Sequence, residues 1–182
     1  MNFSQVIEYC PRCGSDSFPE KAPHFFLCED CDFHFHINCT PGVVGIVADN
    51  AGGVLLIRRG KDPGKGKFSV PGGFVDSNET IEAALARELR EEVNLEMVAA
   101  EYLSSYPNPY LYRGVVFPVV DLIFVCEVRT LETLSASDEV ESFEFVDPAE
   151  IDLNEIAFPS IRHGLERYIQ KRVSILTRQK EQ

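Results

Sequence analysis

The chain lacks tryptophan, and none of its apolar runs approaches the roughly 20 residues that a bilayer span requires. The first residues, Met1 to Gln5, have neither the basic nor the apolar stretch of a secretory signal, so we expect a cytoplasmic protein without a membrane partner. Positive charge is scarce, because 17 Lys and Arg stand against 29 Asp and Glu and leave a net charge of −12. Such a field repels a phosphate backbone, so no nucleic-acid partner is expected. A compact anionic ligand is compatible with it if metal ions lie between ligand and protein.

Four of the six cysteines form two Cys-x-x-Cys pairs, which are Cys10 with Cys13 and Cys28 with Cys31. In a reducing compartment this spacing is typical of metal ligands rather than disulfides. Four thiolates complete a tetrahedral shell without an open position for water, so the pairs predict a structural Zn²⁺. A redox dithiol is the weaker alternative. A segment of about forty residues buries too little surface to fold unaided, and metal binding would supply the difference.

The character of the sequence changes near residue 40. Before it, Cys, Pro and aromatic residues are crowded together, and His34 and His36 alternate as exposed residues of a strand do. After it, apolar and periodic segments predict strands at 43–48, 54–57, 96–105, 115–127 and 141–146. We therefore expect a zinc ribbon over 1–40 and a second domain over 41–182, with helices over 80–93 and from about Pro159 onward. In the last helix, core spacing is found at Ile161, Leu165, Tyr168, Ile169, Val173 and Leu176.

The first of these helices carries acids in an unusual place. At 100° per residue, its early apolar residues Ile81, Ala84 and Leu85 share one face. Continuing the same stripe by steps of three and four brings up the carboxylates of Glu88, Glu91 and Glu92. A merely solvated acidic face would be expected on the opposite side of the helix. The pattern therefore indicates carboxylates that point inward for a chemical reason.

Like charges at helical spacing repel one another, and a hard divalent cation offsets that repulsion. Mg²⁺ prefers a few carboxylate oxygens together with water and substrate phosphate. Arg87 can hold one carboxylate through a bidentate pair, and the turn at Pro71-Gly72-Gly73 lets backbone carbonyls approach the same ion. These residues predict a site for Mg²⁺ or Mn²⁺ on the helix.

Gly73, Glu79 and the segment 87–95 (R-E-L-R-E-E-V-N-L) together resemble the Nudix box, G-x5-E-x7-R-E-U-x-E-E-x-G-U, in which U is a bulky apolar residue. Asn94 stands where the family has glycine. Asparagine tolerates the left-handed conformation, so we expect the helix to keep its C-terminal cap there. The resemblance extends over roughly 41–175.

The resemblance implies the α/β class, as a Nudix α/β/α sandwich with a mixed sheet preceded by the zinc ribbon. It also implies hydrolysis of a nucleoside diphosphate linked to another moiety. Carried onto this chain, the metal ligands would be the Gly72 carbonyl, Glu88, Glu91 and Glu92, with Arg87 and Glu79 orienting them. Family members usually add one acid from outside the box as metal ligand or general base. We favour Glu141 for it and place Glu139 second; an ordinary acidic loop is the alternative.

The substrate is less clearly indicated. A zinc ribbon before a Nudix domain resembles the NADH pyrophosphatase architecture, but the S-Q-P-W-P-F-P-x-S motif of that group is not met by 104–112. Pro109 falls where ADP-ribose hydrolases of the family have proline, and Tyr112 where diadenosine polyphosphate hydrolases have tyrosine. The closing segment 154–161 is similar to zinc-ribbon enzymes acting on ADP-ribose or FAD.

Candidate substrate contacts are aromatic and basic. Tyr106, Tyr110 and Tyr112 can stack on a base, with ordinary packing as the alternative. Around the Gly-rich loop before the box, phosphate contacts are available to Arg58 first, and to Arg59, Lys61, Lys65 and Lys67, with surface solvation as the alternative.

We expect hydrolysis of the pyrophosphate linkage of ADP-ribose or a related dinucleotide such as NADH or FAD. The competing hypotheses are a regulator that senses a nucleotide without turnover and an enzyme acting on RNA ends. A homodimer is compatible with the family resemblance.

Overall fold

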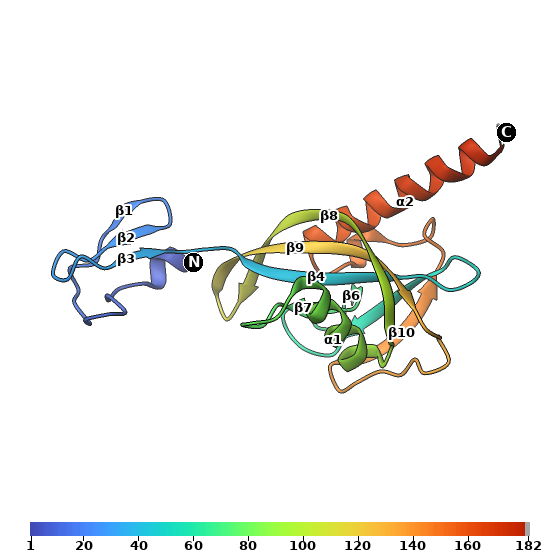
Figure 1. Cartoon of the computed structure of the whole chain (residues 1–182), viewed down its shortest axis with the longest axis horizontal. Coiled ribbons are helices and arrows are strands. Elements are labelled where there is room, and N and C mark those ends of the chain that lie inside the picture. Colours follow the sequence, from blue (N-terminus) through green and yellow to red (C-terminus); the bar gives the residue numbers. More distant parts are fainter. Residues whose placement is uncertain (181–182) are drawn as a thin grey trace. The chain divides into compact units, whose positions relative to one another are not determined.

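The computed structural model describes the backbone of residues 1–180 and the side chains of residues 1–173. In chain order its elements are η1 (Phe3–Val6), β1 (Glu20–Ala22), β2 (Phe25–Leu27), β3 (His34–His36), β4 (Thr40–Val47), β5 (Val54–Arg59), β6 (Phe68–Ser69), β7 (Gly72–Phe74), α1 (Ile81–Val93), β8 (Met97–Tyr112), β9 (Val115–Val128), β10 (Val140–Val146), η2 (Leu153–Glu155) and α2 (Pro159–Lys180) (Figure 1). Among these residues, no helix is both long and apolar enough to cross a membrane.

The chain forms two compact units. The first comprises Met1–Thr40 and also Pro109–Val119, the tip of the β8–β9 hairpin; the second takes in the rest. The sequence predicts a single division at residue 40, which would place the hairpin tip in the second domain, but the tip belongs to the first unit. Two contacts attach the hairpin tip to the N-terminal residues of the first unit. The Val116 amide donates a hydrogen bond to the Met1 carbonyl at 2.8 Å, and the ring of Phe117 contacts the ring of Phe3.

The remainder of the first unit is a small sheet in the order β1-β2-β3 over an apolar cluster that includes Cys10, Phe18, Phe26 and Cys28. The alternation along β3 places His34 and His36 at the surface, as expected from the sequence. A sheet this small buries little, which agrees with the need for a metal to complete the fold.

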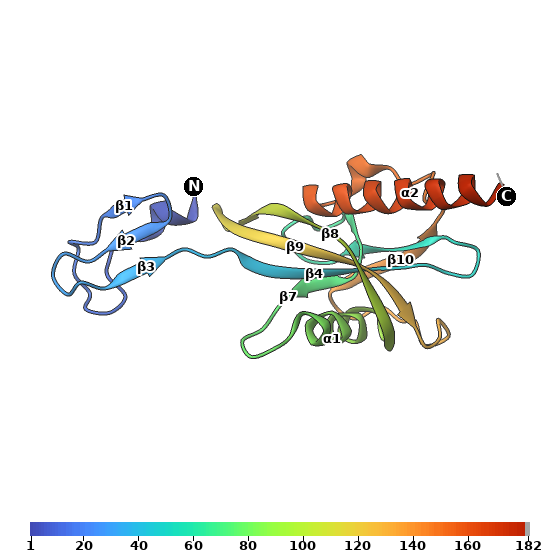
Figure 2. The same cartoon turned by 45° about the horizontal axis from the view of Figure 1, so that its top comes forward.

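The second unit contains a sheet in the order β7-β4-β9-β8 and another in the order β10-β5-β6. Alternate side chains of the central strands face opposite ways, as the two-residue period of a strand requires. Val43 and Val47 of β4 pack with α1, whereas Val44 and Ile46 pack with α2. Figure 2 shows the two helices on opposite sides of the strands. The expected α/β/α arrangement is confirmed.

Helix α1 is capped at both ends, by Thr80 before it and by Asn94 after it. The Thr80 hydroxyl accepts a hydrogen bond from the Ala83 amide at 3.2 Å. Asn94 adopts the left-handed conformation (φ 54°, ψ 37°), and the Asn94 and Leu95 amides donate to the Arg90 and Leu89 carbonyls. This pattern of bonds closes a helix with a left-handed residue, so the expectation that asparagine preserves the cap is confirmed.

In helix α2 the apolar pattern predicts more buried residues than the structure has. Ile161, Leu165 and Tyr168 are buried, but the Val173 side chain is 58% exposed, so its predicted core position is wrong. Leu176 lies outside the described side chains. In Figure 1 the C-terminal turns of α2 lead away from the strands. Helical periodicity identifies the face turned toward a sheet, but it does not tell how far along the helix the sheet extends.

Candidate active site

The helix carboxylates open onto an acidic cavity of about 460 Å³ in the second unit. It is lined by Glu88, Glu91 and Glu92 of α1, by Lys61, and by Ser137, Asp138 and Glu139. Lys61 follows β5 and Glu139 precedes β10, so the strand ends and the helix supply the walls. The predicted cluster of three glutamates is therefore brought to one cavity.

The three glutamates differ in their exposure. Ala84, Leu85 and Leu89 are fully buried on the same side of α1, and Glu92 follows them with only 9% of its surface exposed. Among the side chains alone, Glu88 is 13% exposed and Glu91 is 60% exposed. Glu88 and Glu92 thus continue the inward apolar stripe, whereas Glu91 is exposed at the rim of the cavity lining and its expected inward position is wrong.

Burial makes the negative charge of these carboxylates costly. It raises the pKa of Glu92 to about 7; the Gly72 amide opposes this shift, while the charges of Glu88 and Glu139 add to it. Burial also raises the pKa of Glu88, and repulsion from Glu91 and Glu139 acts in the same direction. A divalent cation among these oxygens would remove the penalty. The donor set is all oxygen and suits Mg²⁺ or Mn²⁺.

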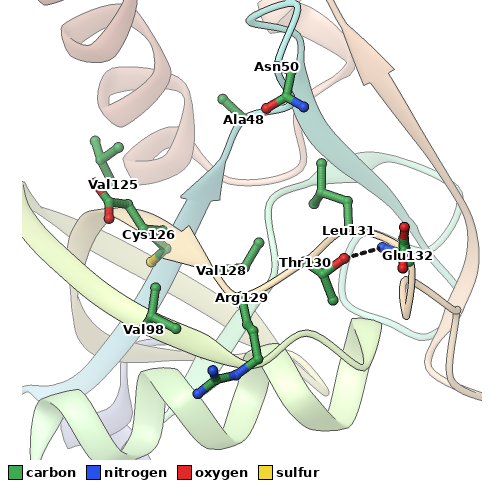
Figure 3. A pocket seen from close by; sticks show the side chains of 11 residues that line it. Ala48, Asn50, Val98, Val125, Cys126, Val128, Arg129, Thr130, Leu131 and Glu132 are labelled. Atoms are coloured by element: carbon green, nitrogen blue, oxygen red, sulfur yellow. Dashed lines mark hydrogen bonds between the residues drawn. The ribbon is translucent and has the colours of Figure 1, made fainter.

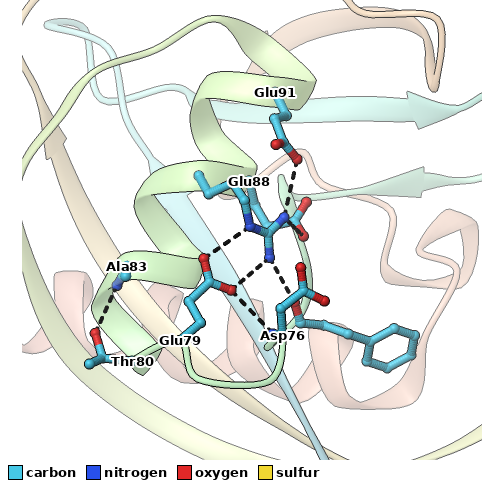
Figure 4. Close-up of polar contacts among 8 residues, drawn as sticks. Asp76, Glu79, Thr80, Ala83, Glu88 and Glu91 are labelled. Atoms are coloured by element: carbon cyan, nitrogen blue, oxygen red, sulfur yellow. Dashed lines mark hydrogen bonds and ion pairs between the residues drawn. The ribbon is translucent and has the colours of Figure 1, made fainter.

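Arg87 connects the cavity carboxylates to the loop before the helix. It donates two hydrogen bonds of 3.0 Å each to the Glu79 carboxylate, one of 2.7 Å to Glu88 and one of 3.1 Å to Glu91. A further bond of 3.0 Å reaches the Phe74 carbonyl. Figure 4 shows the interactions that converge from Glu79, Glu88 and Glu91. Hydrogen bonding to Arg87 lowers the pKa of Glu79, which therefore stays ionised as the anchor of this network.

The two glycines before the helix allow its acids to approach the β7 backbone. The Gly72 amide donates to the Glu92 carboxylate at 2.9 Å. At Gly72, where φ is +154°, a Cβ would collide with the Val43 carbonyl of the neighbouring strand; at Gly73 it would collide with the Glu88 carboxylate. A side chain at Gly72 is excluded by the neighbouring backbone, whereas one at Gly73 would require the Glu88 carboxylate to move. Metal ligation by the Gly72 carbonyl stays a prediction.

The segment that carries Glu139 is attached to the C-terminal end of α1. The Ser135 amide donates to the Val93 carbonyl and the Ser137 amide to the Glu92 carbonyl, at 3.2 and 3.0 Å. Asn94 and Thr133 exchange two bonds of 2.9 Å, each side chain donating to the carbonyl of the other residue. One wall of the cavity is thus connected by hydrogen bonds to the helix that forms the other.

Two acids from outside the box, Asp138 and Glu139, line the cavity. Among the described residues, Glu141 is not part of the lining; it lies exposed on β10. The sequence favours Glu141, but the cavity lining contains the second choice, Glu139, and the role of either acid stays a prediction. Strand alternation does not separate the two acids, because residues two apart on a regular strand share a side. Glu139 precedes β10, and the pairing of β10 with β5 shifts register between Val140 and Ser142, an irregularity that no sequence period indicates.

The residues expected to contact the substrate are divided between the two units. The Arg58 guanidinium donates to the Gly66 carbonyl at 2.6 Å and lies 4.1 Å from the centre of the Phe68 ring. Tyr106, in the second unit, lies against the His163 ring at 5.1 Å. Tyr110 and Tyr112 belong to the first unit. Their roles in substrate binding stay predictions.

The four paired cysteines form a compact cluster in the first unit. All four sulfur atoms lie within 4.8 Å of one another, with Cys10 and Cys31 at 3.8 Å and Cys13 and Cys28 at 3.6 Å. A tetrahedral site with zinc–sulfur bonds of about 2.3 Å has sulfur–sulfur edges of about 3.8 Å. The geometry therefore fits a Cys₄ zinc site, as the sequence predicts.

A larger cavity, of about 660 Å³, lies near the end of β9 (Figure 3). Its walls include Val98, Cys126 and Leu131, and the Arg129 side chain in its lining is paired with Glu96. Within the described part of the chain, the four paired cysteines are the group of His, Cys, Asp and Glu ligand atoms that lie within 4.8 Å of one another, and neither this cavity nor the acidic one holds a cluster as tight. The smaller cavity, with its convergent acids, is the better candidate for catalysis.

Sequence reasoning missed a buried polar group on the α2 side of the sheet. Asp121, 6% exposed, accepts hydrogen bonds from Asn108 at 2.8 Å and from the Ser160 hydroxyl at 2.5 Å. Asp121 lies in an apolar strand, and its partners are 13 and 39 residues away, so no local pattern indicates the contact.

Comparison with known proteins agrees with this geometry. The model of the NUDIX domain matches residues 40–168. An ADP-ribose pyrophosphatase from Methanocaldococcus jannaschii is 35% identical over 116 residues, which cover 63% of this chain and 66% of that protein. The NAD-capped RNA hydrolase NudC from Shigella flexneri is 32% identical over 108 residues, which cover 59% of this chain and 41% of that protein. The chain thus spans less than two thirds of the length of these curated relatives.

Among solved structures, a NUDIX hydrolase from Nitrosomonas europaea superposes with a TM-score of 0.70 and 26% identity, over 92% of this chain and 93% of that one. A MutT protein from Methanosarcina mazei shares the fold at a TM-score of 0.62 and 24% identity. Because the NUDIX model covers well over half of the residues and includes the glutamate helix, the chain is a member of the Nudix hydrolase family.

Proposed function

We propose that the protein hydrolyses the pyrophosphate linkage of a nucleoside diphosphate derivative with the help of Mg²⁺ or Mn²⁺. The observation that carries this proposal is the convergence of Glu88, Glu91 and Glu92 on one acidic cavity together with Glu139. Burial disfavours the charge of two of these carboxylates, and structural stability alone gives no reason to place them together.

Glu88, Glu91, Glu92 and Glu139 would hold the catalytic cations, with the Gly72 carbonyl as a backbone ligand. Such cations neutralise pyrophosphate charge and lower the pKa of water. The chain's own residues do the rest: Arg87 and Glu79 fix the direction of the ligands, and the Gly72 amide orients Glu92. A glutamate of the cavity accepts the proton of the attacking water.

ADP-ribose is the first substrate to test. The relative from Methanocaldococcus jannaschii is named an ADP-ribose pyrophosphatase. NADH and FAD follow, because they share the linkage of two phosphates between an adenosine and a second group. The cysteine cluster would hold a structural Zn²⁺ that stabilises the first unit without taking part in hydrolysis.

The test is turnover by the purified full chain. We expect AMP release from ADP-ribose that depends on added Mg²⁺ or Mn²⁺ and is abolished in Glu91→Gln and in Glu92→Gln. Glu82→Gln on the same helix, outside the cavity lining, is the matched control and should retain activity. Absence of hydrolysis across ADP-ribose, NADH and FAD, with binding of ADP-ribose intact, would favour the alternative of a nucleotide-sensing regulator.

RNA ends are a second candidate because NudC from Shigella flexneri is named an NAD-capped RNA hydrolase. NAD-capped RNA therefore belongs in the same assay. Faster turnover of capped RNA than of ADP-ribose would contradict the expectation, drawn from the net charge of −12, that nucleic acid is not a partner.

A further inference from the structure

Five basic residues surround the Gly-rich loop, and they are not equivalent. Arg58 is bound to the Gly66 carbonyl, and Arg59 donates to the Pro63 carbonyl at 2.8 Å and lies over the Phe158 ring. Within the part of the chain that the structure describes, Lys61 is the one cation that lines the acidic cavity. Lys61 is therefore the residue of this loop that can act on a ligand in the cavity.

Lys61 is paired with the acid of the opposite strand end. Its Nζ lies 2.7 Å from the Glu139 Oε1. The pairing of β5 with β10 brings the two together, since the Gly60 amide donates to the Glu139 carbonyl at 2.9 Å. Both backbones are thus fixed by the sheet, and only the two side chains are left to move.

The ion pair between Lys61 and Glu139 costs little to break. Both side chains are 60% exposed, and exposed pairs of this kind contribute little to stability. The lysine ammonium is a point charge on a flexible four-carbon stem, so it can change partner without a backbone shift. Meanwhile the charge of Glu139 acts on Glu88 and Glu92 in the same cavity, which is where a divalent cation would lie.

We propose that Lys61 is an exchangeable counter-ion, which neutralises Glu139 in the metal-free protein and contacts the substrate diphosphate once a divalent cation takes Glu139. This inference rests on the proposed function. It predicts two opposite effects of removing Lys61: tighter metal binding, because a competitor for Glu139 is lost, and weaker substrate binding, because a phosphate contact is lost.

The first arm measures metal affinity without substrate. Mn²⁺ alone is titrated into the zinc-loaded full chain and the free ion is followed by electron paramagnetic resonance. Lys61→Met should bind Mn²⁺ about two- to fivefold more tightly, the range that corresponds to an exposed ion pair. Lys171→Met removes one lysine charge from another exposed ion pair, that with Glu101, outside the cavity lining and should match the wild type.

The second arm measures kinetics with ADP-ribose and Mg²⁺. Lys61→Met should raise KM about tenfold, or about 1.4 kcal/mol, with a smaller change in kcat. Lys61→Arg keeps the charge and should recover most of the loss. Equal values for Lys61→Met and wild type in both arms would overturn the inference, as would the same changes in Lys171→Met.

A double-mutant cycle tests the exchange directly. In a Glu139→Gln background, Lys61→Met should no longer affect Mn²⁺ affinity, because the carboxylate for which the two cations compete is gone. Additive effects would show that Lys61 acts through general charge and would refute the exchange. If the wild type hydrolyses none of the substrates, the proposed function fails, whereas the Mn²⁺ cycle still decides whether Lys61 competes for Glu139.

Discussion

Arg87 binds Glu79 through two hydrogen bonds of equal length, 3.0 Å each, and extends the same guanidinium to two of the cavity glutamates. Lysine cannot reproduce this fork, because its ammonium is a single point charge. We expect Arg87→Lys to lower kcat/KM for ADP-ribose about ten- to a hundredfold, as loss of an orienting partner does at metal sites. Arg90→Lys, exposed on the same helix, is the control and should stay near wild type.

The second prediction concerns the glycine that precedes the helix. A Cβ at Gly73 would meet the Glu88 carboxylate, so Gly73→Ala should displace that ligand. We expect Mn²⁺ affinity to fall about tenfold or more. Ser77→Ala, in the exposed loop between Gly73 and the helix, should bind Mn²⁺ as the wild type does. Unchanged affinity in Gly73→Ala would show that Glu88 is not a metal ligand.

The third prediction follows from the buried Glu92. Its pKa is raised from 4.5 to about 7, so between these values the folded protein holds a proton that the unfolded chain releases. The stability of the zinc-loaded protein, without Mg²⁺ or Mn²⁺, should therefore decrease as the pH rises through this window. The slope is at most about 1.4 kcal/mol per pH unit. Urea unfolding at pH 6 and pH 8 measures it, and Glu92→Gln should reduce the difference. An equal slope in that variant would contradict the assignment.

The fourth prediction tests the polar contact between α2 and the sheet. Ser160 donates to the buried Asp121 carboxylate, and its removal leaves a desolvated charge with one partner fewer. We expect Ser160→Ala to destabilise the fold by about 1–3 kcal/mol, measured by urea unfolding. It should also raise the pKa of Asp121 further, because the hydroxyl now lowers it against the effect of burial. Ser142→Ala on the exposed face of β10 should have little effect.

The fifth prediction concerns zinc. Cys28→Ser should abolish the one equivalent of zinc expected in the purified protein, measured by elemental analysis, because three thiolates leave the tetrahedral shell incomplete. Cys39 is exposed and lies outside the cluster, so Cys39→Ser should retain the metal. Equal zinc contents in the two variants would contradict the Cys₄ assignment.

Features carried by local spacing could be predicted from the sequence. The inward positions of Glu88 and Glu92 follow from helical periodicity, and the left-handed cap at Asn94 from the chemistry of asparagine, whereas the expected inward position of Glu91 is wrong. The cysteine cluster follows from the spacing of two short turns. In each case the information lies within a few residues, where backbone geometry limits the alternatives.

Features that depend on pairing between distant segments could not be predicted. The choice of Glu139 over Glu141 depends on the register of β10 against β5, about eighty residues earlier in the chain. The same register brings Lys61 to the cavity wall. Gly72 and Gly73 were interpreted as a turn, but they form strand β7 against β4. These relationships are fixed by tertiary packing, which local propensity does not contain.

Hydrogen bonds from Ser135, Ser137 and Asn94 join helix α1 to the segment that carries Glu139. Ions that enter between them meet ligands whose backbones were ordered when the chain folded. Little conformational entropy is then lost on loading, which strengthens metal binding relative to a site that must order its ligands first. Substitution of Asn94 by the glycine common in the family would remove one bond of this connection and would loosen the catalytic centre from a position that touches none of its ligands.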